Sequence, residues 1–580
     1  MVKAKYKQKD ELGMYNIVEL FSGIGSQAKA LRNIGQRVNL IATSEWDVHA
    51  IIAYDLIHNR GDVPTEIKEL SKNDLLELLK GYTFSNTGKA PLDFSSLKTY
   101  SLEVLQHLYF SIKRNNNFVD ISALDGTNLP GNIDVLTYSF PCQDLSNVGA
   151  FHGYNKGIDK GSGSRSSLLW QVGRILSEMK EANIQLPRFL LMENVPTLLS
   201  ARHFTNFSTW ICDLRKLGYV SKYYQLNASN FGLPQNRPRL LMISVYVGDS
   251  EEETELVLDY FKSKDEEAVI GDYRQSEFFH QYTVQDLLRT NYDNPKIFEE
   301  AVECTPNDTV SRRKIWDENP QIIRAGNVFN EEIEVVRTIT TKQDRNPNSG
   351  NLYFDSGIEG RSKFRYLTPR ECMLFMGFSD EDFRQLKNNN LQFHKGDALF
   401  ARDKVIRMSG NSIPVKLLEG VFLQIVQIDN LLNTYRQRVF TRNAEFSEKK
   451  RYVKKITRYL FPRKIRCRAS GGQYPESPDV VFPAYNAALF VHDCFQHSHG
   501  CEQSSIPVVN SRFWESRIKG IVEEDLAKYS ELEAHGWKPI VVWKCELEES
   551  KIEETIKRLE TQIRKNGNKR KPKSNLGREE

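Results

Sequence analysis

One cysteine and one glutamate each follow an apolar run in the first third of the chain. Cys142 comes just after the run 133–140, and Glu193 comes just after the run 188–192, with Asn194 beside it. If both runs are buried strands that end at one edge of a sheet, the thiol can act as a nucleophile and the carboxyl group can move a proton. An inert buried cysteine and a capping or salt-bridging glutamate are the alternative interpretations.

Two arginines stand at alternate positions shortly after this pair. Arg237 and Arg239 precede the apolar run 240–245, which we expect to be another strand. Alternate residues of an extended segment point to the same side. We therefore expect both guanidinium groups to face the edge that carries Cys142 and Glu193, where they would supply fixed positive charge. Solvated arginines that flank a strand are the alternative.

A glycine-rich turn follows the first apolar run of the chain. Phe21, Gly23 and Gly25 lie in the segment 18–25, and residues 26–34 are predicted to form a helix. Glycines let the backbone approach a ligand closely, and the first turn of a helix offers unpaired N–H groups. The pattern indicates a nucleotide-like cofactor, with an ordinary tight turn as the alternative.

A second predicted strand, 40–44, ends in an acid and an aromatic residue. Glu45 lies about twenty positions beyond the glycines, where a carboxylate can accept hydrogen bonds from ribose hydroxyls. Trp46 could stack on an adenine ring. A helix-start acid beside a half-buried aromatic ring is the alternative interpretation.

The order of these segments resembles that of the DNA (cytosine-5) methyltransferase family over residues 14–430. The resemblance implies an α/β fold with a Rossmann-like catalytic domain formed by residues 14–246 and 365–430, S-adenosyl-L-methionine as cofactor and double-stranded DNA as substrate. It adds four residues to the cofactor site: Asp120, Ile121, Asn411 and Ser412. Met408 departs from the family, which often carries glutamine there.

The implied chemistry explains why the site needs both a thiol and an acid. Cys142 would attack C6 of a cytosine that has left the base stack, while Glu193 holds a proton at N3. C5 then takes the methyl group, and loss of its proton allows the thiol to leave. Arg237 and Arg239 would organise this site. A tRNA methyltransferase of the same fold is an alternative.

Between residues 247 and 364 the alternation of strands and helices fades, which resembles the family's target-recognition region. The polar stretch 340–350 suits a loop that contacts base edges or phosphates, although an ordinary surface loop is the alternative. The target sequence cannot be predicted from these residues.

A dense group of cysteines and histidines lies near the other end of the chain. Cys494, His499 and Cys501, with the distant Cys545, form a four-ligand set suited to structural zinc. Asp479, His492 and His497 are then free for chemistry. Core histidines or a disulfide are the alternatives. A disulfide is disfavoured in an intracellular DNA enzyme, because the interior of the cell is reducing.

This segment, 441–555, resembles the very-short-patch repair (Vsr) T/G mismatch endonuclease family. The resemblance implies an α/β restriction-endonuclease-like fold and a Mg²⁺-dependent nick beside the thymine of a T·G mismatch. Asp479 would bind Mg²⁺, His492 and His497 would assist attack on the phosphodiester, and Glu448 would be a further catalytic acid. Gln496 stands where the family has a tryptophan wedge beside Phe495, which leaves the nuclease's selectivity open.

Two other functions of the C-terminal segment stay open. It could cleave unmethylated target DNA, which would make the chain a bifunctional restriction-modification enzyme, or it could be a non-catalytic zinc domain that binds DNA. The first alternative predicts double-strand breaks in matched, unmodified duplex. The second predicts zinc without cleavage.

Composition agrees with a DNA-modifying enzyme. The 580 residues carry a formal net charge of only +4, so affinity for DNA must come from local patches such as the acid-free window 449–468, which also suggests a domain junction. Eight cysteines without a signal peptide or a membrane-spanning run predict a cytoplasmic, nucleoid-associated bacterial protein. We expect a monomer that works beside mismatch-repair or restriction proteins, with a disordered basic tail at 566–580.

Overall fold

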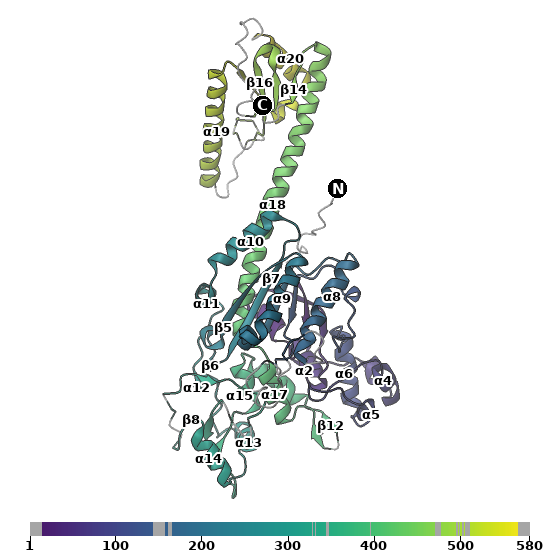
Figure 1. Ribbon diagram of the computed structural model, residues 1–580, viewed down its shortest axis with the longest axis vertical. Coiled ribbons are helices and arrows are strands. Elements are labelled where there is room, and N and C mark those ends of the chain that lie inside the picture. The colour runs from purple at the N-terminus through teal and green to yellow at the C-terminus, as the bar shows by residue number, and fades with distance from the viewer. Residues whose placement is uncertain are drawn as a thin grey trace. The chain divides into compact units, whose positions relative to one another are not determined.

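The computed structural model divides the chain into two compact units between Leu432 and Asn433 (Figure 1). It describes residues 14–142, 145, 157–159, 165–326, 329–330, 332–343, 347, 349–394, 396–469, 477–494, 497, 499–501, 504 and 511–565. Side chains of residues 394, 441–448, 469 and 511–517 lie outside this description.

A six-stranded sheet forms the centre of the first unit, with the strand order β2-β1-β3-β4-β7-β5. Strands β1 to β4 are parallel, and β7 runs antiparallel to both of its neighbours. The bounds are β1 (Met14–Leu20), β2 (Arg37–Ser44), β3 (Val135–Tyr138), β4 (Phe189–Asn194), β5 (Tyr219–Asn227) and β7 (Pro238–Tyr246). This mixed sheet confirms the α/β class expected for the methyltransferase part.

Successive residues of the strands pack into two different cores, as the alternation of side chains in a strand requires. Ile17, Leu191 and Ile243 lie in one buried cluster, whereas Leu190 and Met242 lie in the other. The first cluster includes residues of α1 (Ser26–Asn33), α2 (Val48–Asn59), α6 (Leu102–Arg114), α10 (Glu251–Ser263), α11 (Glu266–Gln275) and the first part of α18 (Val415–Leu460). The second includes α8 (Leu169–Glu181) and α9 (Ala201–Lys216). The sheet is therefore buried on both faces.

A smaller hydrophobic cluster around Trp316, Ile339 and Leu352 lies within the segment 284–406. Three short strands belong to it, in the order β11-β10-β8: β8 (Gln321–Ile323), β10 (Asn351–Tyr353) and β11 (Phe364–Arg365). The helices α10 and α11, which the expected recognition region 247–364 includes, pack instead with the main sheet. The other elements of this unit are α3 (Thr65–Lys68), α4 (Lys72–Leu79), α5 (Phe94–Leu97), α12 (Val284–Leu287), α13 (Pro295–Glu303), α14 (Val310–Glu318), α15 (Pro369–Phe375), α16 (Asp380–Asn388), α17 (Arg402–Asn411), β6 (Gln235–Asn236), β9 (Val336–Arg337), β12 (Gln392–His394) and β13 (Asp397–Ala398).

A buried polar group joins β1 to α18 in the first unit. The Tyr15 hydroxyl donates to Asp429 Oδ2 at 3.0 Å, and Arg188 pairs both with Asp429 and, at 3.2 Å, with Asp134. Burial, followed by the Asp429 carboxylate, raises the pKa of Tyr15 far above its usual value, so the hydroxyl remains a donor. The two carboxylates and one guanidinium satisfy each other where an unpaired charge would be strongly destabilising.

A four-stranded sheet forms the centre of the second unit, in the order β14-β15-β16-β17. Its bounds are β14 (Arg468–Ala469), β15 (Val480–Phe482), β16 (Ala487–His492) and β17 (Lys538–Trp543), and only β16 and β17 pair in parallel. Leu489 and Val491 pack with the end of α18 and with α20 (Ile552–Arg564). Ala488 and Phe490 pack with Leu532 of α19 (Ser511–Ala534). Helices thus cover both faces of this sheet as well.

The acid-free window 449–468 does not begin as a linker, because α18 continues to Leu460. Ile456 and Leu460 are fully buried in the second unit. Among the described residues, none of the helices is both long enough and apolar enough to span a bilayer.

Candidate active sites

A cavity of about 410 Å³ lies at the carboxyl ends of the parallel strands of the first unit. The strand order changes direction at β1, which has β2 on one side and β3 on the other. Ligands of open α/β sheets bind in the crevice at such a point. Twelve of the thirteen residues predicted from the sequence for this half of the chain line the cavity: Phe21, Gly23, Glu45, Trp46, Asp120, Ile121, Cys142, Glu193, Arg237, Arg239, Asn411 and Ser412.

The remaining predicted residue, Gly25, is the last residue of the glycine-rich turn and is not among those that line the cavity. It caps α1 with φ +79°, and a Cβ atom there would lie 2.1 Å from Nε2 of His58. His58 is neutral: its Nε2–H donates to the Ile24 carbonyl at 3.0 Å, and its Nδ1 accepts from Arg32 at 2.8 Å. Burial, then the Arg32 charge, lowers the pKa of His58 to about 3. His58 therefore packs against Gly25 and holds the turn through its hydrogen bond to Ile24. No local signal in the sequence indicated this role.

Glu45 is held by the backbone around the cavity. Its carboxylate accepts N–H bonds from Gly23 at 3.0 Å, Trp46 at 2.9 Å and Asp47 at 2.8 Å. Burial and the neighbouring Asp47 raise the pKa of Glu45 to about 7, although the N–H donors oppose this shift. Oε2 accepts only the Gly23 bond among the described residues, so it can still accept a hydroxyl group.

Cys142 and Glu193 line the same cavity, as predicted from the ends of β3 and β4. Glu193 pairs with Nε of Arg239 at 2.9 Å. Burial raises the pKa of the Glu193 carboxyl and of the Cys142 thiol, and the Arg239 charge is the largest influence that lowers each of them. Asn194 donates to the Phe140 carbonyl at 3.0 Å and thereby ties the two strand ends together.

Arg237 makes different contacts from Arg239. It is 2% exposed and donates to the carbonyls of Ile339 at 2.8 Å, Gly410 at 2.7 Å and Ser412 at 2.9 Å. These carbonyls belong to a segment beside β9 and to the end of α17. Both arginines line the cavity, as their alternate positions predicted. Arg237 donates to backbone carbonyls, whereas Arg239 pairs with the Glu193 carboxylate.

A second group of titratable residues lies at one end of the sheet in the other unit. His492 and His497 stack with ring centroids 3.9 Å apart, and Asp525 Oδ2 lies 3.1 Å from Nε2 of His497 and 3.7 Å from that of His492. His492 also contacts the Tyr529 hydroxyl. Burial, then the His497 charge, lowers the pKa of His492 to about 3, which favours the neutral imidazole.

Asp479 lies at the start of β15 and accepts from the Val491 N–H at 2.8 Å. Lys449 pairs with the same carboxylate at 3.0 Å. Asp525 and Lys449 were not predicted. Asp525 lies in the acidic run 523–525, where nothing in the sequence distinguishes it from its solvated neighbours.

The four predicted metal ligands are brought together from two distant segments. The donor atoms of Cys494, His499, Cys501 and Cys545 all lie within 4.8 Å of one another. Cys545 Sγ is 3.3 Å from His499 Nε2, a separation suited to two ligands of one tetrahedral ion. Burial and the adjacent thiols raise the pKa of Cys494 to about 12, so a cation would be needed to make this group of thiolates favourable. The donor set thus fits zinc.

Several predicted features fall outside the residues that the structure describes. They are the Glu448 side chain, Phe495, Gln496, parts of the loop 340–350 and the tail 566–580.

Comparison with known proteins identifies both parts of the chain. Residues 15–89 and 97–427 match the family model of the C-5 cytosine-specific DNA methylase, and residues 429–503 match that of the DNA mismatch endonuclease Vsr. The orphan methyltransferase M.SssI of Spiroplasma monobiae is 30% identical over 70% of this chain and 96% of its own length. The type II nicking enzyme V.NmeAIP of Neisseria meningitidis is 36% identical over 19% of this chain and 79% of its own length.

A crystal structure of the S. pombe Dnmt2 methyltransferase aligns with a TM-score of 0.41 and 16% identity, over 71% of this chain and 98% of that one. Both resemblances inferred from the sequence are confirmed by the family matches. The chain belongs to the C-5 cytosine-specific DNA methylase family and carries a Vsr-type mismatch endonuclease domain behind its methylase part.

Proposed function

We propose that the first unit methylates C5 of a cytosine flipped out of a specific DNA sequence, through a covalent adduct with Cys142. The observation that carries this proposal is the common cavity in which Cys142, Glu193 and Arg239 meet the glycine-rich turn and Glu45. S-adenosylmethionine, when bound, supplies an electrophilic methyl group. Glu45 would hold its ribose, and Asn411 and Ser412 would line the far side of its pocket.

The protein's own groups account for the remaining steps. Cys142 attacks C6 as the thiolate, and the nearby Arg239 charge favours that form. Glu193, whose pKa is raised by burial, delivers a proton toward N3. Arg237 holds the end of α17 against the cavity and is a positioning residue. After loss of the C5 proton, the thiol leaves and the cytosine returns to the stack.

Mapping 5-methylcytosine at base resolution in a methylation-free bacterial host would test this proposal. We expect modification at every copy of one short motif. A duplex with 5-fluorocytosine at the target base should then trap the Cys142 adduct, because no C5 proton can leave. A blank map from soluble protein, with transfer to tRNA instead, would overturn the DNA substrate.

We also propose that the second unit nicks T·G mismatches that arise when 5-methylcytosine deaminates. Its support is the group formed by His492, His497 and Asp525 beside Asp479. Mg²⁺ binds through one or two carboxylates together with substrate phosphates, and Asp479 fits that pattern once Lys449 releases it. A bound Mg²⁺ would supply a Lewis acid and a metal-held water. Asp525 would orient His497.

Cleavage of two duplexes that contain the mapped motif, one with a T·G mismatch and one matched and unmethylated, would separate the alternatives. The T·G duplex alone should be nicked in the presence of Mg²⁺. Double-strand cleavage of the matched, unmethylated duplex would favour a restriction enzyme. Bound zinc without cleavage of any duplex would favour a DNA-binding domain.

The domain limits expected from the sequence stay part of the proposal, with the catalytic domain at 14–246 and 365–430, target recognition at 247–364 and the nuclease at 441–555. We propose that the protein acts as a monomer on bacterial DNA.

A further inference from the structure

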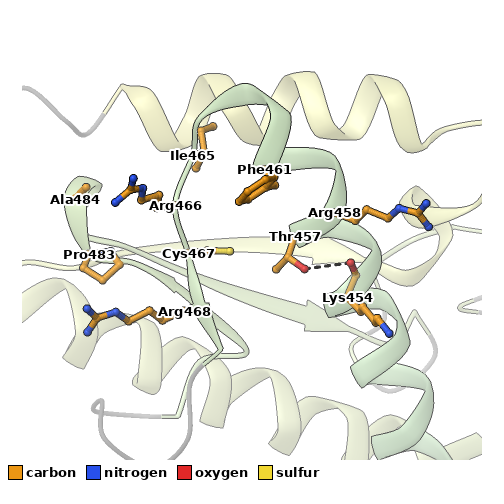
Figure 2. Close-up of a pocket in the computed structure, with 10 residues that line it drawn as sticks. All are labelled: Lys454, Thr457, Arg458, Phe461, Ile465, Arg466, Cys467, Arg468, Pro483 and Ala484. Atoms are coloured by element: carbon orange, nitrogen blue, oxygen red, sulfur yellow. Dashed lines mark hydrogen bonds between the residues drawn. The ribbon is translucent and has the colours of Figure 1, made fainter.

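A second cavity, of about 870 Å³, lies in the C-terminal unit away from the histidine group (Figure 2). The last turns of α18 form one side, and residues 466–468, with Pro483 and Ala484, form the other. Asp479 and Pro483 lie at opposite ends of β15, so the two sites are separated by about 13 Å along the strand at its usual rise.

The cavity has an apolar centre between two cationic sides. Phe461, Ile465 and Cys467 lie in the middle of the view in Figure 2. Lys454 and Arg458 lie on the helix side, and Arg466 and Arg468 on the extended side, where the two arginines alternate. None of the ten lining residues, all of which are described, is acidic. The net charge of the lining is therefore +4.

The cations of the cavity differ from their neighbours in pairing with no acidic side chain among the described residues. Arg463 pairs with Glu553 and Glu560 at 3.4 and 3.3 Å. Lys449, one helical turn before the cavity, pairs with Asp479 at 3.0 Å. Within the described residues, Lys454, Arg458, Arg466 and Arg468 make no ion pair. Four adjacent unneutralised charges repel one another, so a bound polyanion would stabilise this surface.

Phe461 distinguishes this cavity from a simple phosphate-binding patch. Phe461 is 78% exposed and lies among the four cations of the cavity. An exposed ring offers its face to a planar group, and bases stack on aromatic side chains in proteins that bind single strands. In a duplex the base faces are already stacked on one another. An unpaired nucleotide, in contrast, carries both a phosphate charge and an accessible planar face.

We infer that this cavity binds an unpaired stretch of a DNA strand, with a base against Phe461 and the flanking phosphates at Arg466 and Arg468. It is a second DNA site of the C-terminal unit, and it does not depend on whether the histidine group cleaves DNA. A strand released beside a nick is one source of such a ligand.

Binding of a labelled twelve-residue thymidine oligonucleotide to the full-length protein, followed by fluorescence anisotropy, would test the inference. Phe461→Ala should weaken binding about tenfold, the loss typical of one stacked base, without changing the salt dependence. The double change Arg466→Gln with Arg468→Gln should lower the slope of log K against log salt by about 1.4, because each phosphate contact to a single strand contributes about 0.7.

Matched controls exist on the same unit. Phe440 is 76% exposed on α18, the helix that ends one residue before Phe461, so Phe440→Ala removes an equally exposed ring outside the cavity. Lys551→Gln with Lys557→Gln removes the same charge from exposed positions outside the lining. All these side chains are exposed, so the melting temperature should not change. Neither control should reproduce the effect of its counterpart.

Four results would overturn the inference. Phe461→Ala could bind the oligonucleotide as wild type does, or Phe440→Ala could lose as much affinity. If Phe461→Ala lost as much affinity for a matched duplex as for the oligonucleotide, the cavity would be a phosphate-binding patch without base stacking. Tighter binding of the corresponding uridine oligonucleotide would show an RNA site.

Discussion

Replacement of Arg237 by lysine should destabilise the first unit far more than the same replacement of Arg239. Arg237 is buried and makes three charge-assisted hydrogen bonds to carbonyls of two segments. Such bonds contribute about 1.5–3 kcal/mol each, and one ammonium group cannot reach three carbonyls that a planar guanidinium spans. Loss of two of them predicts a decrease of about 3–6 kcal/mol in the free energy of unfolding.

Arg239 provides the matched comparison. It pairs with Glu193 through a side chain that is 12% exposed, and a lysine can keep that ion pair. We expect Arg239→Lys to lower stability by about 1 kcal/mol or less, while methyl transfer slows because the charge beside Cys142 moves. Arg237→Lys should instead weaken cofactor binding, because Gly410 and Ser412 line the cavity.

Urea unfolding followed by circular dichroism can measure both effects, with cofactor affinity measured by calorimetry. The chain has two units, so the transition of the second unit, which neither substitution touches, serves as an internal reference. The reasoning would be refuted if Arg237→Lys unfolded within about 1 kcal/mol of wild type, well below the loss of even one such hydrogen bond.

Four further predictions concern single groups. Cys142→Ser should abolish methyl transfer and leave zinc content and nicking intact; substantial residual methylation would remove Cys142 from its role. Because the pKa of Glu45 is raised to about 7, its carboxylate gains charge as pH rises, so cofactor affinity should be about tenfold higher at pH 8 than at pH 6; Glu45→Gln should bind weakly without this pH dependence, and an unchanged profile would contradict the ribose contact. Asp525→Asn should slow nicking at least about tenfold while methylation continues, as loss of an orienting carboxylate does elsewhere; nicking at the wild-type rate would exclude Asp525 from the site. Cys545→Ser should lose bound zinc and lower the melting temperature of the second unit alone, and full zinc occupancy by mass spectrometry would disprove this ligand set.

Local signals in the sequence predicted residues at the strand ends, and the order of the motifs, which resembles that of the methyltransferase family, added Asp120, Ile121, Asn411 and Ser412. Cys142 and Glu45 follow β3 and β2, and Glu193 is the second-last residue of β4. The apolar runs were therefore enough to place the strand ends, and the parallel sheet brings those ends together. The cysteines and histidines between 492 and 501 were equally visible, because these residue types are rare and densely spaced.

Residues whose role depends on a partner from another segment could not be predicted in this way. His58 is ordinary in its helix, and only the fold brings it under Gly25. Asp525 is one of three consecutive acids, and the packing of α19 decides which of them reaches His497. The acid-free window suggested a junction, but charge does not interrupt a helix whose Ile456 and Leu460 are buried.

The contact between Tyr15 and Asp429 constrains the order in which the first unit can fold during synthesis. The two residues are separated by 414 positions, so the first strand emerges from the ribosome long before its buried partner. At about 5–20 residues per second, that interval lasts roughly 20–80 s. Asp429, which accepts from Tyr15 and pairs with Arg188, joins this buried group only when α18 has been made, so the group is complete only then. A truncation meant to separate the two activities must therefore retain the chain through Asp429, because a methyltransferase fragment that stops before it would lose one of the two carboxylates that pair with Arg188.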